Sequence, residues 1–324
     1  MKVLVCGGAG YIGSHMVRQL QASGHETIVF DNLSTGHREA IEGVVLIVGD
    51  LRDPLALREL FAGHEFDAVI HFCARSLVGE SLNEPYAYYE NNVVGTLNLL
   101  QAMRLAGVTK LVFSSTAAVF GNPAKLPIDE EHATNPINPY GASKLMVERI
   151  LFDAARAYGL RSVALRYFNA AGADVQGGIG ESHTPETHLI PNIIRAALGL
   201  GEALQVFGVD YATRDGTCIR DYVHVNDLAL AHLKAVKFLE SRDGAHVFNL
   251  GNGEGFTVLE MIEAARQVTR AKIDFKCAPR RVGDPPVLVA SSVKARDQLG
   301  WVPMFSSIHA IIESAWHWHR AQRF

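Results

Sequence analysis

An excess of charge and a strongly basic segment are both missing from this chain. Its 324 residues carry 30 lysines and arginines against 34 acidic residues, which gives a net charge of −4 at pH 7. The lack of any basic block argues against nucleic acid or an anionic membrane as the main partner. No uncharged apolar run approaches the roughly 20 residues of a membrane span, and no signal-peptide pattern precedes residues 2–6. We therefore expect a cytoplasmic protein that does not bind membranes.

Cysteine is scarce, and the recognised metal-ligand spacings are lacking. The four cysteines stand far apart, without a C-x-x-C pair: Cys6, Cys73, Cys218 and Cys277. We interpret them as the reduced thiols of a cytosolic protein. The 14 histidines include no H-E-x-x-H or similar set, and His317 and His319 lie two apart, on different faces of a helix. We therefore expect no metal site.

What the sequence does contain is an ordinary globular composition, with 48% hydrophobic and 20% charged residues, and a regular alternation of elements. Short apolar runs predict strands at residues 2–6, 26–30, 44–48, 68–72, 110–114 and 161–165. Helical patterns separate most of them, at residues 11–22, 54–61, 84–106 and 140–158. Most of these runs are apolar throughout, as in strands buried on both faces of a parallel sheet. The repeated β–α order therefore predicts an α/β fold with a doubly wound parallel Rossmann sheet.

The second half of the sequence is less regular. Residues 172–187 are rich in glycine, histidine, threonine and acidic residues, and we expect a long loop there. Helices are expected at residues 189–199, 222–240, 258–269 and 306–319, with a strand-like opening at 222–225. An apolar strand at 246–250 is expected to return to the main sheet. We therefore expect two domains, one over residues 1–169 with this returning strand, and a smaller α/β domain mainly from residues 170–324.

Three glycines directly follow the first predicted strand and open the first helix: Gly7, Gly10 and Gly13. Glycine is needed where a backbone turns sharply, approaches a pyrophosphate or packs a helix against a strand. The helix start, which includes Tyr11 and Ile12, offers free N–H groups and the positive end of the helix dipole to phosphates. A lone glycine triad is weak evidence, but its place between a strand and a helix predicts a bound dinucleotide.

The second strand ends on Asp31, 18 residues after Gly13, and Asn32 follows it. An acidic side chain there can accept hydrogen bonds from the adenosine ribose hydroxyls and would repel a 2′-phosphate, so we expect NAD rather than NADP. By the same logic, the residues after the third and fourth strands fall beside the adenine and the rest of the cofactor: Asp50, Leu51, Phe72 and Ala74.

Tyr140 and Lys144 lie four residues apart, which places them on one face of a helix. Thr116 ends the polar part of the fifth strand, 24 residues before Tyr140, and such strand ends point into the ligand crevice. A tyrosine acts as a base near neutral pH if its pKa falls from ~10 to about 7, which requires roughly 4 kcal/mol from nearby cations. Lys144 and a nicotinamide ring are the cations that we expect. The alternative for the tyrosine is a surface position after a proline-rich turn.

The glycine loop together with Thr116, Tyr140 and Lys144 resembles the short-chain dehydrogenase/reductase superfamily, in its extended, nucleotide-sugar branch. Along essentially its whole length the chain also resembles the UDP-galactose 4-epimerases of that branch. The matching blocks are residues 7–14, 31–33, 88–93, 140–148, 166–169, 215–217, 220–225 and 278–284. The last two blocks are specific, since unrelated NAD enzymes lack them.

The resemblance implies an NAD-dependent isomerase that interconverts UDP-galactose and UDP-glucose. In that reaction C4 of the sugar is oxidised while Tyr140 takes the O4 proton, the 4-keto sugar rotates, and hydride returns to the opposite face. Lys144 would bond the nicotinamide ribose, Thr116 would bridge the tyrosine and the reacting oxygen, and Asn91 and Phe168 would contact the cofactor. A homodimer is implied as well, formed by the helices at 84–106 and 140–158, which carry apolar residues on more than one face.

The resemblance also assigns positions to the UDP-hexose substrate. Besides Thr116 they are Asn169, His188, Leu189, Gln205, Val206, Phe207, Arg220, Arg281 and Asp284. Physically, Arg220 and Arg281 would supply charge-assisted bonds to a diphosphate, and Asp284 would accept from a ribose hydroxyl. A surface salt bridge is the alternative for either arginine.

Some positions depart from the family pattern. Thr116 replaces the commoner serine, Phe120 replaces a tyrosine, and Ser76 stands where many members carry a lysine near the cofactor. Leu288 occupies the substrate position whose size limits the 2-substituent of the hexose. A tyrosine there goes with plain hexoses, and a small residue admits N-acetylhexosamines as well. For leucine we expect UDP-glucose and UDP-galactose as the main pair, with limited N-acetyl activity.

Related functions remain open. A 4,6-dehydratase needs an acidic pair directly after Thr116, where this chain has Ala117 and Ala118. A uronate or pentose 4-epimerase uses the same chemistry and differs only in the pocket around C5. A nucleotide-sensing protein of this fold is the non-enzyme alternative, but such proteins usually lose the catalytic tyrosine or lysine, and this chain keeps both.

Overall fold

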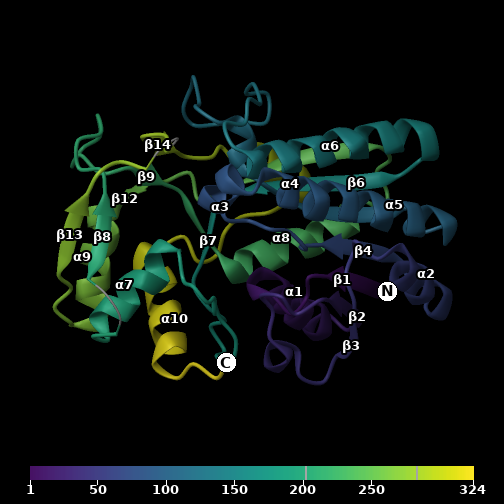
Figure 1. Ribbon diagram of the computed structural model, residues 1–324, viewed down its shortest axis with the longest axis horizontal. Coiled ribbons are helices and arrows are strands. Elements are labelled where there is room, and N and C mark those ends of the chain that lie inside the picture. The colour runs from purple at the N-terminus through teal and green to yellow at the C-terminus, as the bar shows by residue number, and fades with distance from the viewer. Residues whose placement is uncertain (201–202, 282–283) are drawn as a thin grey trace.

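A seven-stranded parallel sheet forms the centre of the structure, a computed structural model that describes residues 1–200, 203–281 and 284–324 (Figure 1). Its strands lie in the order β11-β6-β5-β4-β1-β2-β3. Their bounds are β1 Lys2–Cys6, β2 Glu26–Asp31, β3 Val45–Val48, β4 Ala68–His71, β5 Lys110–Thr116, β6 Arg161–Tyr167 and β11 Ala245–Leu250. All neighbouring pairs are parallel, which confirms the predicted doubly wound sheet. β11 comes from the second half of the chain and pairs with β6, as predicted for the returning strand.

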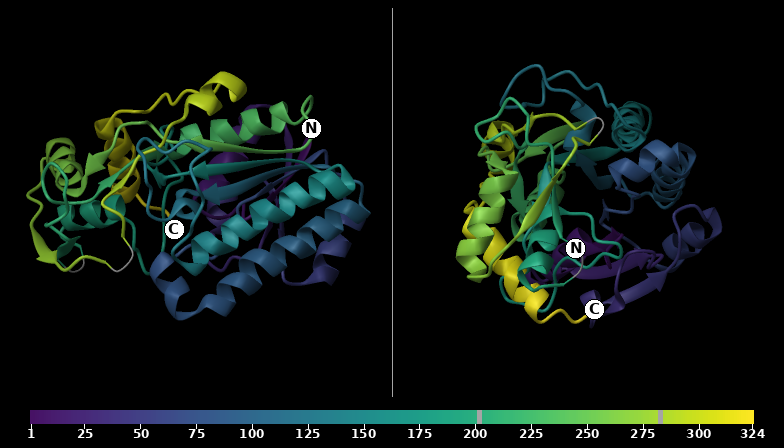
Figure 2. Two further views of the ribbon diagram at one scale, coloured as in Figure 1. Left: turned by 90° about the horizontal axis from the view of Figure 1, so that it is seen from above. Right: turned by 60° about the vertical axis from the view of Figure 1, so that its left-hand side comes forward.

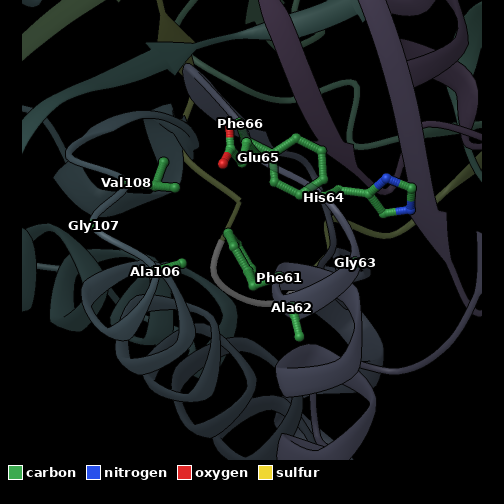
Figure 3. Close-up of a pocket in the computed structure, with 9 residues that line it drawn as sticks. All are labelled: Phe61, Ala62, Gly63, His64, Glu65, Phe66, Ala106, Gly107 and Val108. Atoms are coloured by element: carbon green, nitrogen blue, oxygen red, sulfur yellow. The ribbon is translucent and has the colours of Figure 1, made fainter.

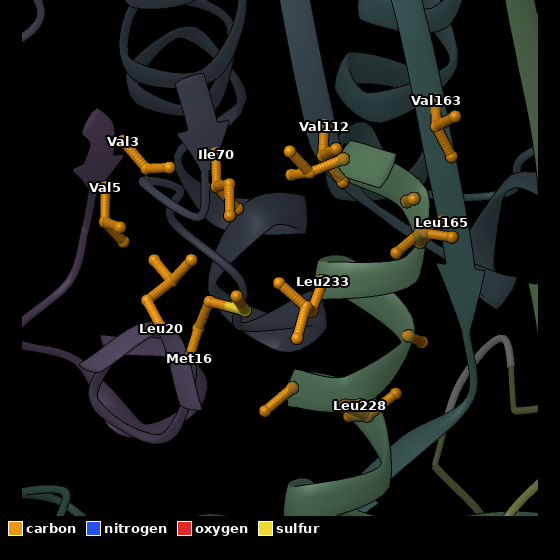
Figure 4. Close-up of a cluster of buried hydrophobic side chains, with 14 of the residues drawn as sticks. Val3, Val5, Met16, Leu20, Ile70, Val112, Val163, Leu165, Leu228 and Leu233 are labelled. Atoms are coloured by element: carbon orange, nitrogen blue, oxygen red, sulfur yellow. The ribbon is translucent and has the colours of Figure 1, made fainter. Parts of the chain in front are cut away.

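Helices cover both faces of this sheet. On one face, α1 (Tyr11–Ala22) and α8 (Val225–Phe238) close a core in which Leu20 and Leu228 are 0% exposed (Figure 4). The other face is covered by α2 (Pro54–Gly63), α5 (Gly95–Leu105) and α6 (Pro139–Tyr158). Each fully buried leucine contributes about 1.5–3 kcal/mol of transfer free energy.

Strand β1 shows why the central strands are apolar throughout. Val3 and Val5 lie in the core beneath α1 and α8, whereas Leu4 and Cys6 lie in the core beneath α2 and α5. Side chains alternate between the two faces of a strand, and here both faces are covered, so no position is left for a polar residue.

The second half of the chain adds a further group of elements beside the edge at which the strands end (Figures 1 and 2). Its helices are α7 Leu189–Ala197, α9 Val258–Thr269 and α10 Ile308–Arg320. Its short strands are β7 Asn169–Ala171 with β10 Tyr222–His224, β8 Leu204–Phe207 with β13 Phe275–Ala278, and β9 Ile219–Arg220 between β12 Phe256–Thr257 and β14 Val287–Leu288. α9 begins at a capping box, in which Thr257 and Glu260 satisfy each other's backbone N–H groups.

The helix predicted over residues 84–106 is confirmed as one helical run from Pro85 to Leu105. Within it, α4 (Pro85–Tyr88) passes through a π-helical turn (Tyr89–Val94) into α5, and a separate short helix, α3 (Val78–Asn83), precedes it. In the π-helical turn, Asn92 is buried, and its side chain bonds the backbone N–H of Arg75 at 2.8 Å and its carbonyl oxygen at 3.0 Å. Pairing this buried amide accounts for the wider turn, and such turns often lie at functional sites.

Smaller features also bear on the predictions. The stretch 172–187 forms a loop, and the helix expected at 222–240 begins only at Val225, after β10. All four cysteines are free thiols. Within the described ranges, no helix is long and apolar enough to cross a membrane.

Candidate active site

The predicted cofactor and catalytic residues lie together at the carboxyl ends of the parallel strands, which form one edge of the sheet. In a parallel sheet all strands end at the same edge, so side chains far apart in the sequence meet there. The predicted residues at the strand ends, or within two residues of them, are Gly7, Asp31, Asp50, Phe72, Thr116 and Phe168.

The loop between β1 and α1 is tight at two of its glycines. Gly7 has a φ of +79°, and a Cβ on it would lie 2.8 Å from the amide nitrogen of Cys73. A Cβ on Gly13 would lie 2.1 Å from the carbonyl oxygen of Gly7. Both distances are shorter than real Cβ contacts, so the loop can close onto its neighbours only with glycine at these positions.

Gly10 differs from Gly7 and Gly13, because the space beside its Cα is open. A Cβ there would meet only the carbonyl oxygen of Gly7, at an ordinary 3.5 Å. Gly10 is the N-cap of α1, and the N–H groups of Tyr11, Ile12 and Gly13 in the first turn have no acceptor within the helix. An open approach to free N–H groups at the positive end of a helix dipole is what a pyrophosphate requires. The loop therefore fits a dinucleotide.

Asp31 ends β2 beside this loop. One of its carboxylate oxygens accepts the N–H of Ala9 at 2.9 Å, and the other accepts the N–H of Leu33 at 2.8 Å. Burial raises the pKa of Asp31, and these two hydrogen bonds oppose the shift. The carboxylate is thus held at the sheet edge, where it suits ribose hydroxyls and disfavours a 2′-phosphate.

At the end of the next strand, the Asp50 carboxylate accepts hydrogen bonds from two side chains, those of Asn32 and Arg52. The Asn32 amide donates to Asp50 at 2.9 Å, and the Arg52 guanidinium donates to the same carboxylate at 2.8 and 3.0 Å. The Arg52 hydrogen bonds hold the pKa of Asp50 well below its usual range. Leu51 packs into the core and is 5% exposed, so a contact with an adenine would come from its backbone.

The residues after β4 and in the π-helical turn are partly buried. Phe72 places its ring 4.6 Å from the ring of His232, between centroids. Asn91 donates to the side chain of Asn92 at 2.9 Å, and Asn92 donates to the Ser143 hydroxyl at 3.0 Å. These bonds tie the predicted cofactor contact Asn91 to α6; Ala74 is also partly buried.

The first turn of α6 brings Tyr140 to the end of β5. Asn138 caps the helix by accepting the N–H of Gly141 at 2.8 Å, and Pro139 takes the first helical position. A Cβ on Gly141 would lie 2.5 Å from the carbonyl oxygen of Ala118. The glycine next to Tyr140 therefore lets the helix approach the turn that follows β5.

Thr116 and Tyr140 are neighbours at the end of β5, where Thr116 is 9% exposed. Burial raises the pKa of Tyr140, and hydrogen bonding toward the nearby Thr116 side chain offsets part of this shift. The chain by itself therefore keeps Tyr140 as a neutral phenol, and a cation beside it is required before it can act as a base.

Lys144 lies one turn further along α6. Its side chain is buried, and its ammonium donates to the carbonyl oxygen of Ser114 at 2.7 Å. Burial lowers the pKa of Lys144 to about 7. That Lys144 and a bound nicotinamide together lower the pKa of Tyr140 stays a prediction.

A buried ion pair beneath this edge was not predicted. Arg166 and Glu148 form a two-pronged pair, with Nη2 at 2.6 Å and Nε at 2.9 Å from the carboxylate, and their side chains are 7% and 3% exposed. The Ser115 hydroxyl donates to the same carboxylate at 2.5 Å. Glu148 follows Lys144 by four residues on α6, so the sequence carried a signal, a further charge at the spacing of the Tyr–Lys pair.

Two of the predicted substrate residues bind each other. Arg220 forms an ion pair with Asp284, and its guanidinium also donates to the carbonyl oxygens of Pro285 and Ile219 at 2.7 Å each. Arg220 is 9% exposed. Since a guanidinium has five N–H donors, these contacts leave part of it for a ligand.

Asn169 and Leu288, two predicted substrate residues, lie on short strands. Asn169 opens β7, and its amide donates to the carbonyl oxygen of Asp221 at 2.8 Å. Leu288 packs against a small core that also contains Phe168 and Ala117. Ala117 directly follows β5, so Leu288 lies toward the end of the sheet that carries Thr116.

Arg281 and Asp284 line a cavity of about 530 Å³. The guanidinium of Arg281 stacks on Phe207, with 4.1 Å between its central carbon and the ring centre. Gln205 is exposed on β8, whereas Val206 is 0% exposed. The Val206 side chain belongs to the core, so a contact with substrate would come from its backbone.

The remaining predicted substrate residues are not among those lining the cavity. His188 precedes α7, and its Nδ1 forms an ion pair with Glu181. Leu189 is partly buried against the core formed by α7, α9 and α10. Val282 and Gly283, which belong to the matching block 278–284, lie outside the described residues.

A second hollow, of about 560 Å³, lies away from these residues (Figure 3). It is lined by the end of α2 and by the residues that lead into β4 and β5, among them Phe66 and Val108. The strands begin there, so this hollow belongs to the opposite edge of the sheet.

Comparisons with known proteins agree with this arrangement. Residues 3–251 match a protein family that is described as the NAD dependent epimerase/dehydratase family. A UDP-glucose 4-epimerase from Halalkalibacterium halodurans is 53% identical, over 99% of this chain and 96% of its own. The UDP-glucose 4-epimerase from Brucella ovis, solved in complex with NAD, has a TM-score of 0.95 at 48% identity, over 98% of this chain and 97% of that one. The enzyme from Bifidobacterium longum, solved with NAD⁺ and UDP, has a TM-score of 0.95 at 39% identity, over 99% of both chains. This chain belongs to the NAD dependent epimerase/dehydratase family.

Proposed function

We propose that this chain is an isomerase that interconverts UDP-galactose and UDP-glucose, with NAD as its cofactor. The observation that carries the proposal is the placement of Thr116 beside Tyr140, with Lys144 one turn away, at the end of the sheet where the strands finish and where the glycine loop also lies. Relatives named UDP-glucose 4-epimerase, 53% and 51% identical to this chain, support the choice of substrate.

NAD fits the residues at this edge. The loop around Gly10 and the first turn of α1 would hold the pyrophosphate, Asp31 would accept from the adenosine ribose, and Lys144 would bond the nicotinamide ribose. When bound, NAD supplies a two-electron oxidant for the sugar and a positive charge near Tyr140.

Tyr140 carries the proton chemistry. Its phenolate accepts the proton of the sugar O4 hydroxyl in the first half of the reaction and returns it in the second half. The Thr116 hydroxyl donates to the reacting oxygen and stabilises the charge that develops there. Arg220 and Arg281 hold the diphosphate by charge-assisted hydrogen bonds, so the sugar can turn about its link to the diphosphate between the two halves.

Leu288 sets the finer preference between substrates. Its side chain is partly buried beside Phe168, and it is smaller than a tyrosine but larger than an alanine. We therefore assign UDP-glucose and UDP-galactose as the main pair, with limited activity on the N-acetylhexosamine forms. Equal turnover of UDP-N-acetylgalactosamine and UDP-galactose would contradict this assignment.

The proposed working form is a homodimer in the cytoplasm. Helices α5 and α6 keep apolar side chains at the surface, with Leu97 37%, Met146 46% and Phe152 41% exposed. Such side chains on two helices suit a helix bundle shared with a second copy. The free cysteines agree with a reducing compartment. A monomeric mass by light scattering at micromolar concentration would contradict the dimer.

The test is to incubate the purified protein with UDP-galactose and no added NAD, and then to separate the nucleotide sugars. We expect UDP-glucose from the wild type, because the cofactor should remain bound through purification. The Tyr140→Phe variant should lose roughly 10²–10⁴-fold in rate while it retains NAD. Tyr86→Phe, at a tyrosine that is 86% exposed, is the matched control. No product from the wild type even after NAD is supplied would overturn the proposal and direct attention to uronates and pentoses.

A further inference from the structure

Four side chains with metal-ligating atoms converge in the loop that leads to α7. They are Glu181, His183, Glu186 and His188, and one ligand atom from each lies within 4.8 Å of the others. No metal site is expected from the sequence, because the pattern E-x-H-x-x-E-x-H is not one of the recognised metal-ligand spacings. The loop fold brings the four together within eight residues of sequence.

The two histidines present the same nitrogen to the same two carboxylates. Nδ1 of His183 lies 3.3 Å from Glu181 and 3.8 Å from Glu186. Nδ1 of His188 forms an ion pair with Glu181 and lies 3.8 Å from Glu186. Ligands bound to one tetrahedral ion at about 2.0–2.1 Å lie about 3.3 Å from each other. The spacing in this cluster is therefore close to that of atoms around a common centre.

The carboxylates are buried, as ligands of an ion would be. The side chains of Glu181 and Glu186 are only 4% and 5% exposed, and two neighbouring buried carboxylates require positive charge between them. Two protonated imidazoles would supply it, but the rings of His183 and His188 lie only 5.5 Å apart, between centroids, and would repel each other. One divalent cation supplies the same charge without this repulsion.

Hydrogen bonds that involve backbone groups hold both glutamates of the cluster in place. An oxygen of Glu186 accepts the backbone N–H groups of Thr187 and His188 at 2.8 Å each. The indole N–H of Trp318 in α10 donates to the carbonyl oxygen of Glu181 at 2.8 Å. The ligand positions are thus held by the protein, and four protein ligands leave no open coordination position for catalysis.

We propose that this cluster of two glutamates and two histidines binds a structural zinc ion. A closed set of imidazole nitrogens and carboxylate oxygens suits Zn²⁺. The ring of His183 also lies 6.4 Å from that of Tyr11, at the start of α1, while His188 directly precedes α7. The Tyr11 hydroxyl, in turn, donates to the carbonyl oxygen of Gly172 at 2.6 Å, where the loop begins. The ion therefore fastens the loop to the starts of both helices.

Metal content and stability test this site. The protein is stripped with a chelator, dialysed against zinc chloride and then against metal-free buffer, and its bound metal is measured by mass spectrometry. We expect one zinc per chain and a higher melting temperature than for the stripped protein. Glu181→Gln and His183→Gln should each weaken zinc binding by about 100-fold or more. His317→Gln, at an exposed histidine in α10, is the matched control and should bind zinc as the wild type does.

Cobalt(II) keeps the test valid even where a variant fails to fold. Wild-type protein loaded with cobalt should show the intense visible absorption of a tetrahedral site, and zinc should displace it. Wild-type protein that holds no stoichiometric zinc and shows no tetrahedral cobalt spectrum would overturn the proposal, as would unchanged zinc affinity in both ligand variants. In that case protons on the two imidazoles neutralise the carboxylates.

Discussion

The cofactor edge and the substrate side of this molecule are built in different ways. At the cofactor edge the constraint is the backbone, since Gly7, Gly13 and Gly141 each lie where a Cβ would collide with a main-chain atom. On the substrate side the constraint is pairing between side chains from remote segments, as in Arg220 and Asp284, which lie 64 residues apart.

This difference implies different tolerances. A backbone contact below 3 Å cannot be relieved by rotating a side chain, so these three glycines cannot be replaced even by alanine without a shift of the backbone. The arginines of the substrate side can change partners when a ligand enters, because their guanidinium groups keep unused donors. Substitutions at the cofactor edge should therefore impair folding, whereas substitutions on the substrate side should lower the affinity for substrate.

The sharpest contrast is within the glycine loop itself. Gly13→Ala places a Cβ 2.1 Å from the Gly7 carbonyl oxygen and should cost more than about 4 kcal/mol of unfolding free energy. Gly10→Ala meets only an ordinary contact and should cost about 1 kcal/mol or less, while it loses bound NAD. Thermal unfolding and the NAD content of the purified variants measure both effects. Equal melting temperatures for the two variants would break the comparison.

The buried pair beneath the edge should give the next largest effect. Glu148→Ala leaves the Arg166 guanidinium buried without its carboxylate, which should lower the unfolding free energy by about 3–5 kcal/mol. Denaturant titration measures this loss. Glu263→Ala, at an exposed pair on α9, is the control and should change stability by about 1 kcal/mol at most. Similar losses in the two variants would show that the pair does not act as a buried one.

On the substrate side we expect an effect on binding without a loss of fold. Arg281→Ala should raise KM for UDP-galactose by roughly 10- to 100-fold, since it removes charge-assisted bonds to the diphosphate, and it should leave the melting temperature nearly unchanged. Arg104 is the matched control, because it also stacks on an aromatic ring, that of Tyr158 at 4.1 Å, but does not line the cavity. An equal rise in KM for Arg104→Ala and Arg281→Ala would contradict the assignment.

Acid should weaken the fold steeply through its buried histidines. Burial lowers their pKa to about 3 for His71 and to about 4 for His15, His224 and His232. In the unfolded chain they take up protons below about pH 6.5, so the unfolded state binds more protons between pH 6.5 and 4 and stability falls as the pH falls through that range. Each such histidine contributes about 1.4 kcal/mol per pH unit. Denaturant titrations from pH 7 to pH 4.5 measure the slope, and a melting curve that does not change over this range would contradict it.

The backbone-determined part of the molecule is also the part that its sequence predicts well. The central strands β1, β2 and β4 are largely apolar because both faces of the sheet are covered there, so runs such as Lys2–Cys6 can be identified without knowledge of their neighbours. Gly7 and Gly13 mark the glycine loop in the sequence, because a Cβ at either position would collide with the backbone. Tyr140 is predicted in a similar way, from its helical spacing to Lys144 and from Thr116 at the end of β5.

The other features depend on contacts between residues far apart in the sequence, which no local sequence pattern predicts. The π-helical turn exists because Asn92 pairs with the backbone of Arg75, 17 residues away, and helix periodicity carries no trace of that. The Val206 side chain faces the core because β8 pairs with β13, some 70 residues later along the chain. The cluster around Glu181 arises from a loop fold, although all of its ligands are close together in the sequence.

The most direct test of the account is the fate of the hydrogen on C4 of the sugar. UDP-galactose that carries deuterium at C4 is converted by the wild-type protein in ordinary water, and the C4 position of the product is analysed. If Tyr140 handles only the O4 proton beside NAD, the UDP-glucose should retain its deuterium at C4. Replacement of that deuterium by solvent hydrogen would show that the sugar is epimerised by proton abstraction from carbon, and would contradict the roles assigned to Thr116, Tyr140 and Lys144.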